Sequence, residues 1–159
     1  MIDDFFEKHE ISILTFVAGI SVIMLIMFGG GMAAFIAVAS TEHLVGEFSS
    51  KQLLTYIVAL EIMMNAVIVI PNVLIIVFGK PQAVIVNKIN LYFQFTCYSL
   101  YILTFGHDIE WFCAIFITFS LLAYWLMSTA KYQAFVAFYE ALRKDPVGFR
   151  QRLLDRMHQ

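Results

Sequence analysis

Short polar stretches divide the sequence into four long apolar runs, at about 11–39, 53–78, 82–105 and 109–130. A hydrocarbon core is about 30 Å thick and a helix rises about 1.5 Å per residue, so about 20 apolar residues cross it. Every run reaches that length. The pattern therefore predicts an all-α integral membrane protein with four transmembrane helices in an antiparallel bundle.

Two of these runs carry a stripe of polar side chains along one helix face. In the second run the stripe comprises Glu61, Asn65 and Asn72. In the third run it repeats at three or four residues and comprises Asn87, Asn90, Gln94, Tyr98 and Tyr101. Residues at such spacings share a face because a helix has about 3.6 residues per turn.

Polar groups in hydrocarbon are costly without a partner, so we expect the two stripes to face each other inside the bundle. The chain turns between them at residues 79–82, Gly-Lys-Pro-Gln, and this turn fixes an antiparallel register. The register sets Glu61 level with Tyr98, Asn65 level with Gln94, and Asn72 level with Asn87. The sequence thus predicts one intramembrane polar cluster, comprising Glu61, Asn65, Asn72, Asn87, Asn90, Gln94 and Tyr98.

Glu61 is an ionisable residue within a span, which makes it a candidate functional residue by default. One interpretation is a proton- or ion-binding group of a small transporter, since hydrocarbon surroundings disfavour the anion. The other is a hydrogen-bonded carboxyl that fixes the register of the helices. We favour the second, because no arginine or second carboxylate lies at the same depth.

The first apolar run contains small residues at helical spacing: Gly29, Gly30, Ala33, Ala34 and Ala37. Small residues at intervals of four let two helix backbones approach closely in a membrane. This face is a candidate docking surface for another protein. The alternative, which we favour, is a packing seam to the chain's own helices.

After the fourth run the composition changes, and we assign residues 1–130 to the transmembrane domain and 131–159 to a cytoplasmic helical tail. Asp145-Pro146 ends one helix and starts another, since proline is tolerated in a first helical turn. The last segment predicts a C-terminal basic amphipathic helix. The basic tail comprises Arg143, Lys144, Arg150, Arg152 and Arg156, and it suits anionic lipid headgroups or an acidic partner, or serves only to fix topology.

The distribution of lysine and arginine predicts the orientation in the membrane, because positively charged loops stay in the cytoplasm. With four spans, the two termini and the turn at 79–82 share one side. All but one of the ten Lys and Arg residues lie on that side, and the exception is Lys51. We therefore expect a multi-pass protein of the bacterial inner (plasma) membrane whose N-terminus and C-terminus are both cytoplasmic.

Composition agrees with a membrane protein: 61% of the residues are hydrophobic and 14% are charged, against about 25% charged in soluble domains. A net charge of −2 argues against nucleic acid as a partner. Cys97 and Cys113 lie in apolar runs without a CxxC pattern. No phosphate-binding glycine loop, GxSxG or HExxH is present, so we expect neither an enzyme nor a cofactor.

Two short acidic loops are expected on the opposite, outer face. They carry His43, His107 and Asp108, and imidazole and carboxylate are ligands of zinc, manganese or iron. Their spacing matches no ligand signature, and short polar loops commonly carry such residues. We therefore predict no metal site and retain these three residues only as weak candidates.

These features favour a small protein that acts without catalysis, by helix–helix association with a membrane protein or with its own copies in the bilayer. Immunity proteins against pore-forming toxins and exclusion proteins that block conjugative DNA transfer are similar in size and predicted topology, although no shared motif supports the comparison. The alternative is a subunit of a small oligomeric ion- or proton-coupled transporter or channel that uses Glu61.

Overall fold

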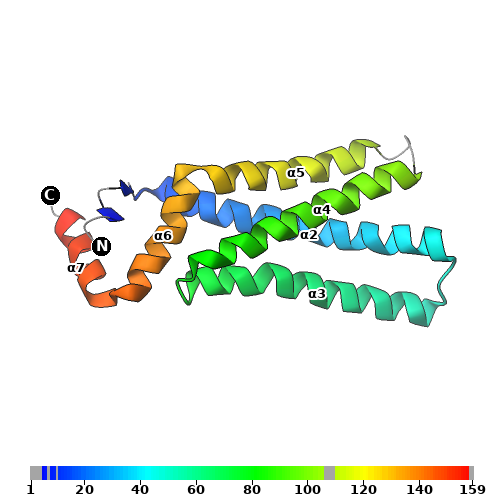
Figure 1. Ribbon diagram of the computed structural model, residues 1–159, viewed down its shortest axis with the longest axis horizontal. Helices are drawn as coiled ribbons and strands as arrows, with labels where there is room; N and C mark the ends of the chain where they lie inside the picture. Colours follow the sequence, from blue (N-terminus) through cyan, green and yellow to red (C-terminus); the bar gives the residue numbers. More distant parts are fainter. Residues whose placement is uncertain (1–4, 7, 10, 106–109, 158–159) are drawn as a thin grey trace.

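The computed structural model describes residues 5–6, 8–9, 11–105 and 110–157, and within these ranges every regular element is a helix. In chain order these are α2 (Ile13–Val45), α3 (Ser50–Ile76), the short 3-10 helix η1 (Pro81–Ala83), α4 (Val84–Phe105), α5 (Glu110–Ser128), α6 (Ala130–Lys144) and α7 (Pro146–Met157). Figure 1 shows α2, α3, α4 and α5 running along the long axis of the molecule, with α6 and α7 at one end.

Two of the described helices, α2 and α3, are long and apolar enough to cross a membrane. A third span is added if Cys113–Ser128 and Ala130–Lys144, which meet at 65°, are taken as one. The prediction of an all-helical protein with apolar helices of spanning length is therefore confirmed.

The first long helix extends further than the apolar run that predicts it. α2 continues to Val45 and α3 begins at Ser50, so the polar stretch at 40–52, expected as the loop between the first two apolar runs, is a loop only over 46–49. The Thr41 hydroxyl in this extension donates to the Ala37 carbonyl one turn earlier at 2.7 Å. The chain leaves the helix only at Gly46, whose φ of 106° is a conformation that glycine adopts without strain.

Capping and turn residues set the limits of α3. Ser49 and Gln52 form a reciprocal capping box at its start. Pro71 is accommodated within the helix. At the far end the chain reverses at Gly79, which has a φ of 62° and packs so tightly on α6 that a Cβ there would lie 2.9 Å from the Tyr139 carbonyl oxygen.

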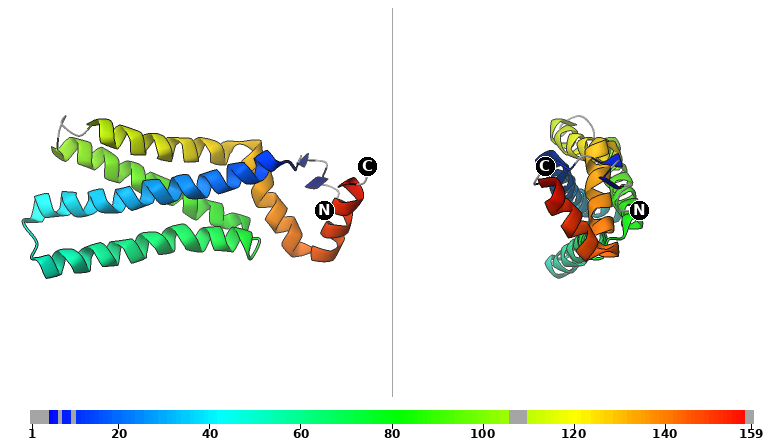
Figure 2. Two further views of the ribbon diagram at one scale, coloured as in Figure 1. Left: turned by 180° about the vertical axis from the view of Figure 1, so that it is seen from behind. Right: turned by 90° about the vertical axis from the view of Figure 1, so that its left-hand side faces the viewer.

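The fourth apolar run ends in a bend. α5 stops at Ser128, and α6 sets off at 65° to it after a break at Thr129. The Thr129 hydroxyl caps the new helix by accepting a hydrogen bond from the Tyr132 amide. Figure 2 shows α6 lying across the ends of the longer helices. It is held there by its apolar face, and the Phe135 ring fills the notch that Gly19 leaves in α2.

α2 is the central helix of the molecule, since it packs against α3, α4, α5 and α6. Its Val22 and Ile26 side chains are fully buried, and with Leu91 of α4 they belong to the largest apolar cluster. By contrast α3 is poorly covered. Only 11% of the residues in its most apolar 18-residue stretch are buried, against 44% in α2.

The two ends of the chain pack together. The Phe149 ring of α7 is fully buried between the rings of Phe5 and Phe6, with ring centroids 5.4 and 5.2 Å away. The Arg156 guanidinium lies 4.8 Å above the Phe6 ring. Figure 1 shows both termini at the end of the molecule where η1 lies.

Candidate functional site

The polar stripe of α4 faces the interior of the protein. Asn87, Asn90, Gln94 and Tyr98 are all buried, as the three- and four-residue spacing predicts. Tyr101, at the outer end of the same stripe, is half-buried. We call the four buried residues the α4 polar ladder.

Gln94 is the point at which the α4 polar ladder joins two other helices. Its Nε2 atom donates to the Ile26 carbonyl of α2 at 3.2 Å. The same atom contacts Asn90 Oδ1 at 3.3 Å, one helical turn away. Its Oε1 atom accepts from the Ser120 hydroxyl of α5 at 2.7 Å. One buried amide thereby links α2, α4 and α5.

Tyr98 makes the next link to α2. Its hydroxyl donates to the Gly29 carbonyl oxygen at 2.6 Å, in a fully buried position. A Cβ on Gly29 would collide with Gln94 Oε1 and lie 3.0 Å from the Ser120 hydroxyl oxygen. Glycine is required at position 29 because α2 approaches the α4 polar ladder so closely.

The small-residue face of α2 is thus occupied by the chain itself. Gly29, Gly30, Ala33 and Ala34 are buried, and a Cβ on Gly30 would lie 2.8 Å from the Ile68 side chain of α3. Ala37 is half-buried. The structure does not leave this face open to another protein, and the packing seam is the interpretation that it shows.

The start of the α4 polar ladder meets α3, as the predicted register requires. Asn87 Nδ2 donates to Asn72 Oδ1 at 3.1 Å, and Asn72 Nδ2 donates to the Ile68 carbonyl at 2.7 Å. Burial raises the pKa of the neighbouring Tyr132 hydroxyl, and a hydrogen bond with Asn87 opposes that rise. The predicted pairing of Asn72 with Asn87 is confirmed.

The other two predicted pairings are wrong. Glu61 and Asn65 are exposed although they share a face with the buried Asn72, whereas Tyr98 and Gln94 bond to α2 and α5. The reason is geometric. Figure 1 shows α3 and α4 close together near η1 and separating along their length, so a level position no longer brings the side chains together.

Asn65 and Glu61 form a polar patch, which we call the α3 polar patch, on an otherwise apolar surface. Asn65 Nδ2 donates to the Glu61 carbonyl oxygen at 2.8 Å. Within the part of the chain that the structure describes, no donor lies within hydrogen-bonding distance of the Glu61 carboxyl. Val58 and Ile62 beside it are 48% and 67% exposed. The Glu61 carboxyl therefore lies in open, mostly apolar surroundings and has no hydrogen-bond partner among the described residues.

The position of Glu61 along α3 adds to the cost of this arrangement. It lies eleven residues after Ser50 and fifteen before Ile76, which is about 17 and 22 Å at 1.5 Å per residue. Glu61 is thus near the middle of a helix that is long and apolar enough to span the bilayer.

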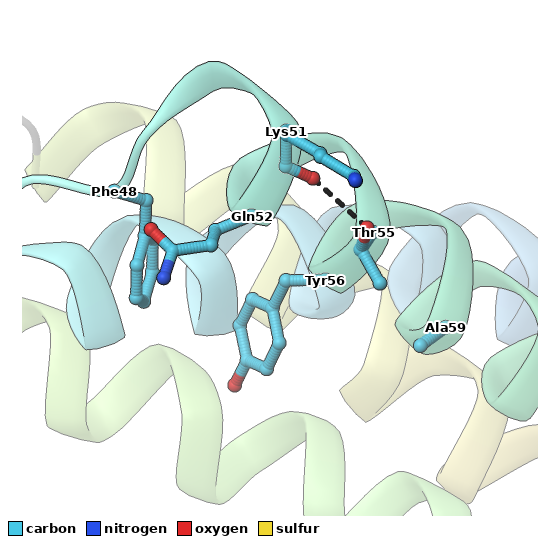
Figure 3. A pocket seen from close by; sticks show the side chains of 6 residues that line it. All are labelled: Phe48, Lys51, Gln52, Thr55, Tyr56 and Ala59. Atoms are coloured by element: carbon cyan, nitrogen blue, oxygen red, sulfur yellow. Dashed lines mark hydrogen bonds between the residues drawn. The ribbon is translucent and has the colours of Figure 1, made fainter.

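An open hollow, which the sequence did not indicate, lies one to three turns before Glu61 on the same helix. It has a volume of about 410 Å³, and Figure 3 shows the residues that line it: Phe48, Lys51, Gln52, Thr55, Tyr56 and Ala59. The Tyr56 hydroxyl lies 3.2 Å from the Thr41 hydroxyl of α2. The hollow is mostly apolar, and its position makes it an extension of the exposed surface of α3.

Of the three weak candidates for a metal site, the structure describes only His43. His43 is exposed, with its ring 4.7 Å from that of Phe105. His107 and Asp108 lie outside the described residues. Among the residues described, no group of three His, Cys, Asp or Glu side chains is placed to hold a metal ion.

The basic tail lies on α6 and α7. Arg143, Lys144, Arg150 and Arg156 are exposed, and Arg152 is half-buried. Lys144 pairs with Glu140 at 2.6 Å, and Arg156 donates to the Phe6 carbonyl at 3.4 Å. Two of the basic residues predicted to bind lipid therefore make contacts within the protein: Lys144 within α6, and Arg156 with the N-terminal segment.

In comparisons with known proteins, no family model, no curated protein and no solved structure matches the chain.

Proposed function

We propose that this is a membrane protein that acts without catalysis, by docking a second transmembrane helix on the exposed face of α3. The observation that carries the proposal is the α3 polar patch, which lies on the surface near the middle of an apolar helix of spanning length. Polar and ionisable residues within spans almost always face protein or water, not acyl chains. A partner helix that covers Glu61 and Asn65 meets this requirement.

The energetic case rests on Glu61. A charged side chain near the bilayer centre costs about 2.5–3.5 kcal/mol on insertion scales. A neutral carboxyl costs less but still needs a hydrogen-bond partner in hydrocarbon. Inside the bundle the chain pairs polar side chains, as in the Ser120–Gln94 and Asn87–Asn72 bonds. The buried atoms there without a partner, Asn87 Oδ1 and Asn90 Nδ2, belong to neutral amides that each make another contact, whereas Glu61 is a carboxyl. The unpartnered patch on α3 is therefore best explained by a contact with another molecule.

The membrane arrangement that we propose has four spans, α2 to α5, with both termini in the cytoplasm of a bacterial inner membrane. Three observations support it. The two ends of the chain pack against each other through Phe149, the turn at Gly79 packs against α6, and the basic residues concentrate near this end. An end that carries most of the lysine and arginine is expected to stay cytoplasmic.

The docking interpretation is preferred over a transport pathway through the chain. Such a pathway would need Glu61 in the interior together with Asn65 and Gln94. Instead Glu61 is exposed, and the interior polar groups around Gln94 are uncharged amides and hydroxyls bonded to each other or to backbone. Immunity and exclusion proteins remain the functional class that size and predicted topology suggest.

Photo-cross-linking in native membranes tests the proposal. A photoreactive amino acid at Ile62 should give a discrete protein adduct, and the double variant Glu61→Leu, Asn65→Leu should weaken it. The matched control is the same probe at Leu121, an exposed position on α5. If the Ile62 probe gives no protein adduct while the protein is folded and inserted, docking on α3 is wrong.

A further inference from the structure

We infer that the helix covering the α3 polar patch is α3 of a second copy of this chain, so that the Glu61 and Asn65 side chains of the two copies pair at one depth. This inference rests on the proposed function, and it names the partner. Three features of the exposed face support it: the spacing of its residues, the symmetry of two copies in one membrane, and the hydrogen-bonding chemistry of the two side chains.

The spacing fits a helix-pair seam. Leu54, Val58, Glu61 and Asn65 follow each other at four, three and four residues and are all exposed. Apolar or small positions alternating at three and four residues are the pattern with which two helices pack at a crossing angle of about 20°. Leu54 and Val58 therefore supply the apolar contacts, and the polar pair falls next in the same seam.

Symmetry places like residues together. Two copies inserted in the same orientation are related by a two-fold axis perpendicular to the membrane, and such an interface uses the same surface on both copies. Every residue then lies at the same depth as its counterpart. Glu61 meets Glu61 of the second copy, and Asn65 meets Asn65, without any adjustment of register.

The chemistry of the α3 polar patch is self-complementary. An amide carries two N–H donors and an acceptor oxygen, and a carboxyl group carries acceptor oxygens, so Asn65 of one copy can donate to Glu61 of the other. Asn65 uses one N–H on the Glu61 carbonyl and keeps its Oδ1 atom and second N–H available. Two such patches satisfy each other, whereas an unrelated protein needs a matching polar pair at that depth.

No other surface of the described chain offers Glu61 a charged or acidic partner at mid-helix. In α2, α4 and α5 the charged residues are Glu42, Lys88 and Glu110, and each lies in or near the terminal turns of its helix. A contact between copies through α3 is therefore the arrangement that pairs Glu61 with a group of its own kind.

Disulfide cross-linking of the full chain in native membranes tests this inference. The background carries Cys97→Ala and Cys113→Ala. In it the variant Val58→Cys should form a disulfide-linked dimer on oxidation, because the proposed seam places the two Val58 residues side by side. A disulfide forms only when the two Cα atoms are about 4.4–6.8 Å apart. Ser99→Cys is the control. Ser99 is exposed on α4, at the depth that the antiparallel register sets beside Glu61, and it should not cross-link.

The polar pairing has its own readout. Adding Glu61→Leu and Asn65→Leu to Val58→Cys should lower the dimer yield by about threefold, and at most about twentyfold, since an interhelical hydrogen bond in a membrane contributes about 0.6 and at most about 1.7 kcal/mol. Glu61→Gln keeps a donor and an acceptor and should retain most of the dimer. Thermal unfolding in detergent checks that each variant is folded.

The outcomes separate the two proposals. If the Ile62 photo-adduct is a different protein and Val58→Cys gives no dimer, docking on α3 stands and self-association is overturned. A dimer whose yield does not respond to the leucine substitutions overturns the pairing of Glu61 and Asn65. The absence of both the photo-adduct and the dimer overturns both proposals.

Discussion

The Tyr98 hydroxyl donates a hydrogen bond to the Gly29 carbonyl oxygen at 2.6 Å, deep between α4 and α2. The small residues of α2 and the polar stripe of α4, which the sequence explains separately, thus meet in one contact. The glycine allows the backbones to approach, and the tyrosine from the α4 polar ladder uses that approach to reach a main-chain acceptor. The small-residue face of α2 and the polar face of α4 are two sides of the same interface.

We predict that Gly29→Ala destabilises the protein, whereas Gly31→Ala does not. A Cβ on Gly29 would collide with Gln94 Oε1, while one on Gly31 meets nothing within 4 Å. Overpacking of a tight interior costs about 1–3 kcal/mol. Thermal unfolding in detergent compares the two variants, and equal melting temperatures would show that α2 and α4 are not in close contact at Gly29.

Tyr98→Phe should lower the stability by about 0.6 kcal/mol and at most about 1.7 kcal/mol, the range for interhelical hydrogen bonds in membrane proteins. The ring keeps its packing, so only the bond to Gly29 is lost. Tyr92→Phe is the matched control, because Tyr92 is exposed and its hydroxyl lies at the longer distance of 3.4 Å from that of Tyr124. Denaturant or thermal unfolding in one detergent should separate the two. A larger effect at Tyr92 would contradict the assignment.

Glu61→Gln and Asn87→Leu should differ in their effect on the isolated chain. Glu61 has no hydrogen-bond partner within the described chain, so its substitution should change the stability of the monomer by less than about 0.5 kcal/mol. Asn87 is buried and bonded to Asn72, so its loss leaves the partner unsatisfied at a cost of about 1–3 kcal/mol. Unfolding of monomeric protein at high detergent-to-protein ratio measures both. Strong destabilisation by Glu61→Gln would restore the interpretation of Glu61 as a register-fixing group.

Phe149→Ala should release the packing between the ends of the chain. Its ring is fully buried against Phe5 and Phe6, and truncating a buried phenylalanine costs about 3–5 kcal/mol of local packing. Limited proteolysis should then cleave α7 and the N-terminal segment faster. Leu154→Ala, at an exposed position of the same helix, is the control. Unchanged cleavage rates in both variants would mean that this cluster does not hold the termini.

The spacing of polar residues correctly predicted which face of α4 is buried, because other helices surround α4. The stripe of α4 is buried from Asn87 to Tyr98, because α4 has α3, α2 and α5 around it. Most of its polar groups bond to these helices or to each other, with Asn87 Oδ1 and Asn90 Nδ2 as exceptions. The same rule failed for Glu61 and Asn65. Periodicity states which residues share a face, but not which neighbour that face meets, and α3 diverges from α4 before it reaches Glu61.

The sequence by itself determined that the chain is helical and apolar over membrane-spanning lengths, since helix period and hydropathy are local properties. It also determined the turn at Gly79 and the stop at Asp145-Pro146. Only the tertiary structure decided that α6 bends away by 65°, that Gly29 and Gly30 of α2 pack internally, and that Glu61 is exposed. Those outcomes depend on crossing angles between helices, which are set by the sum of many side-chain contacts distant in sequence.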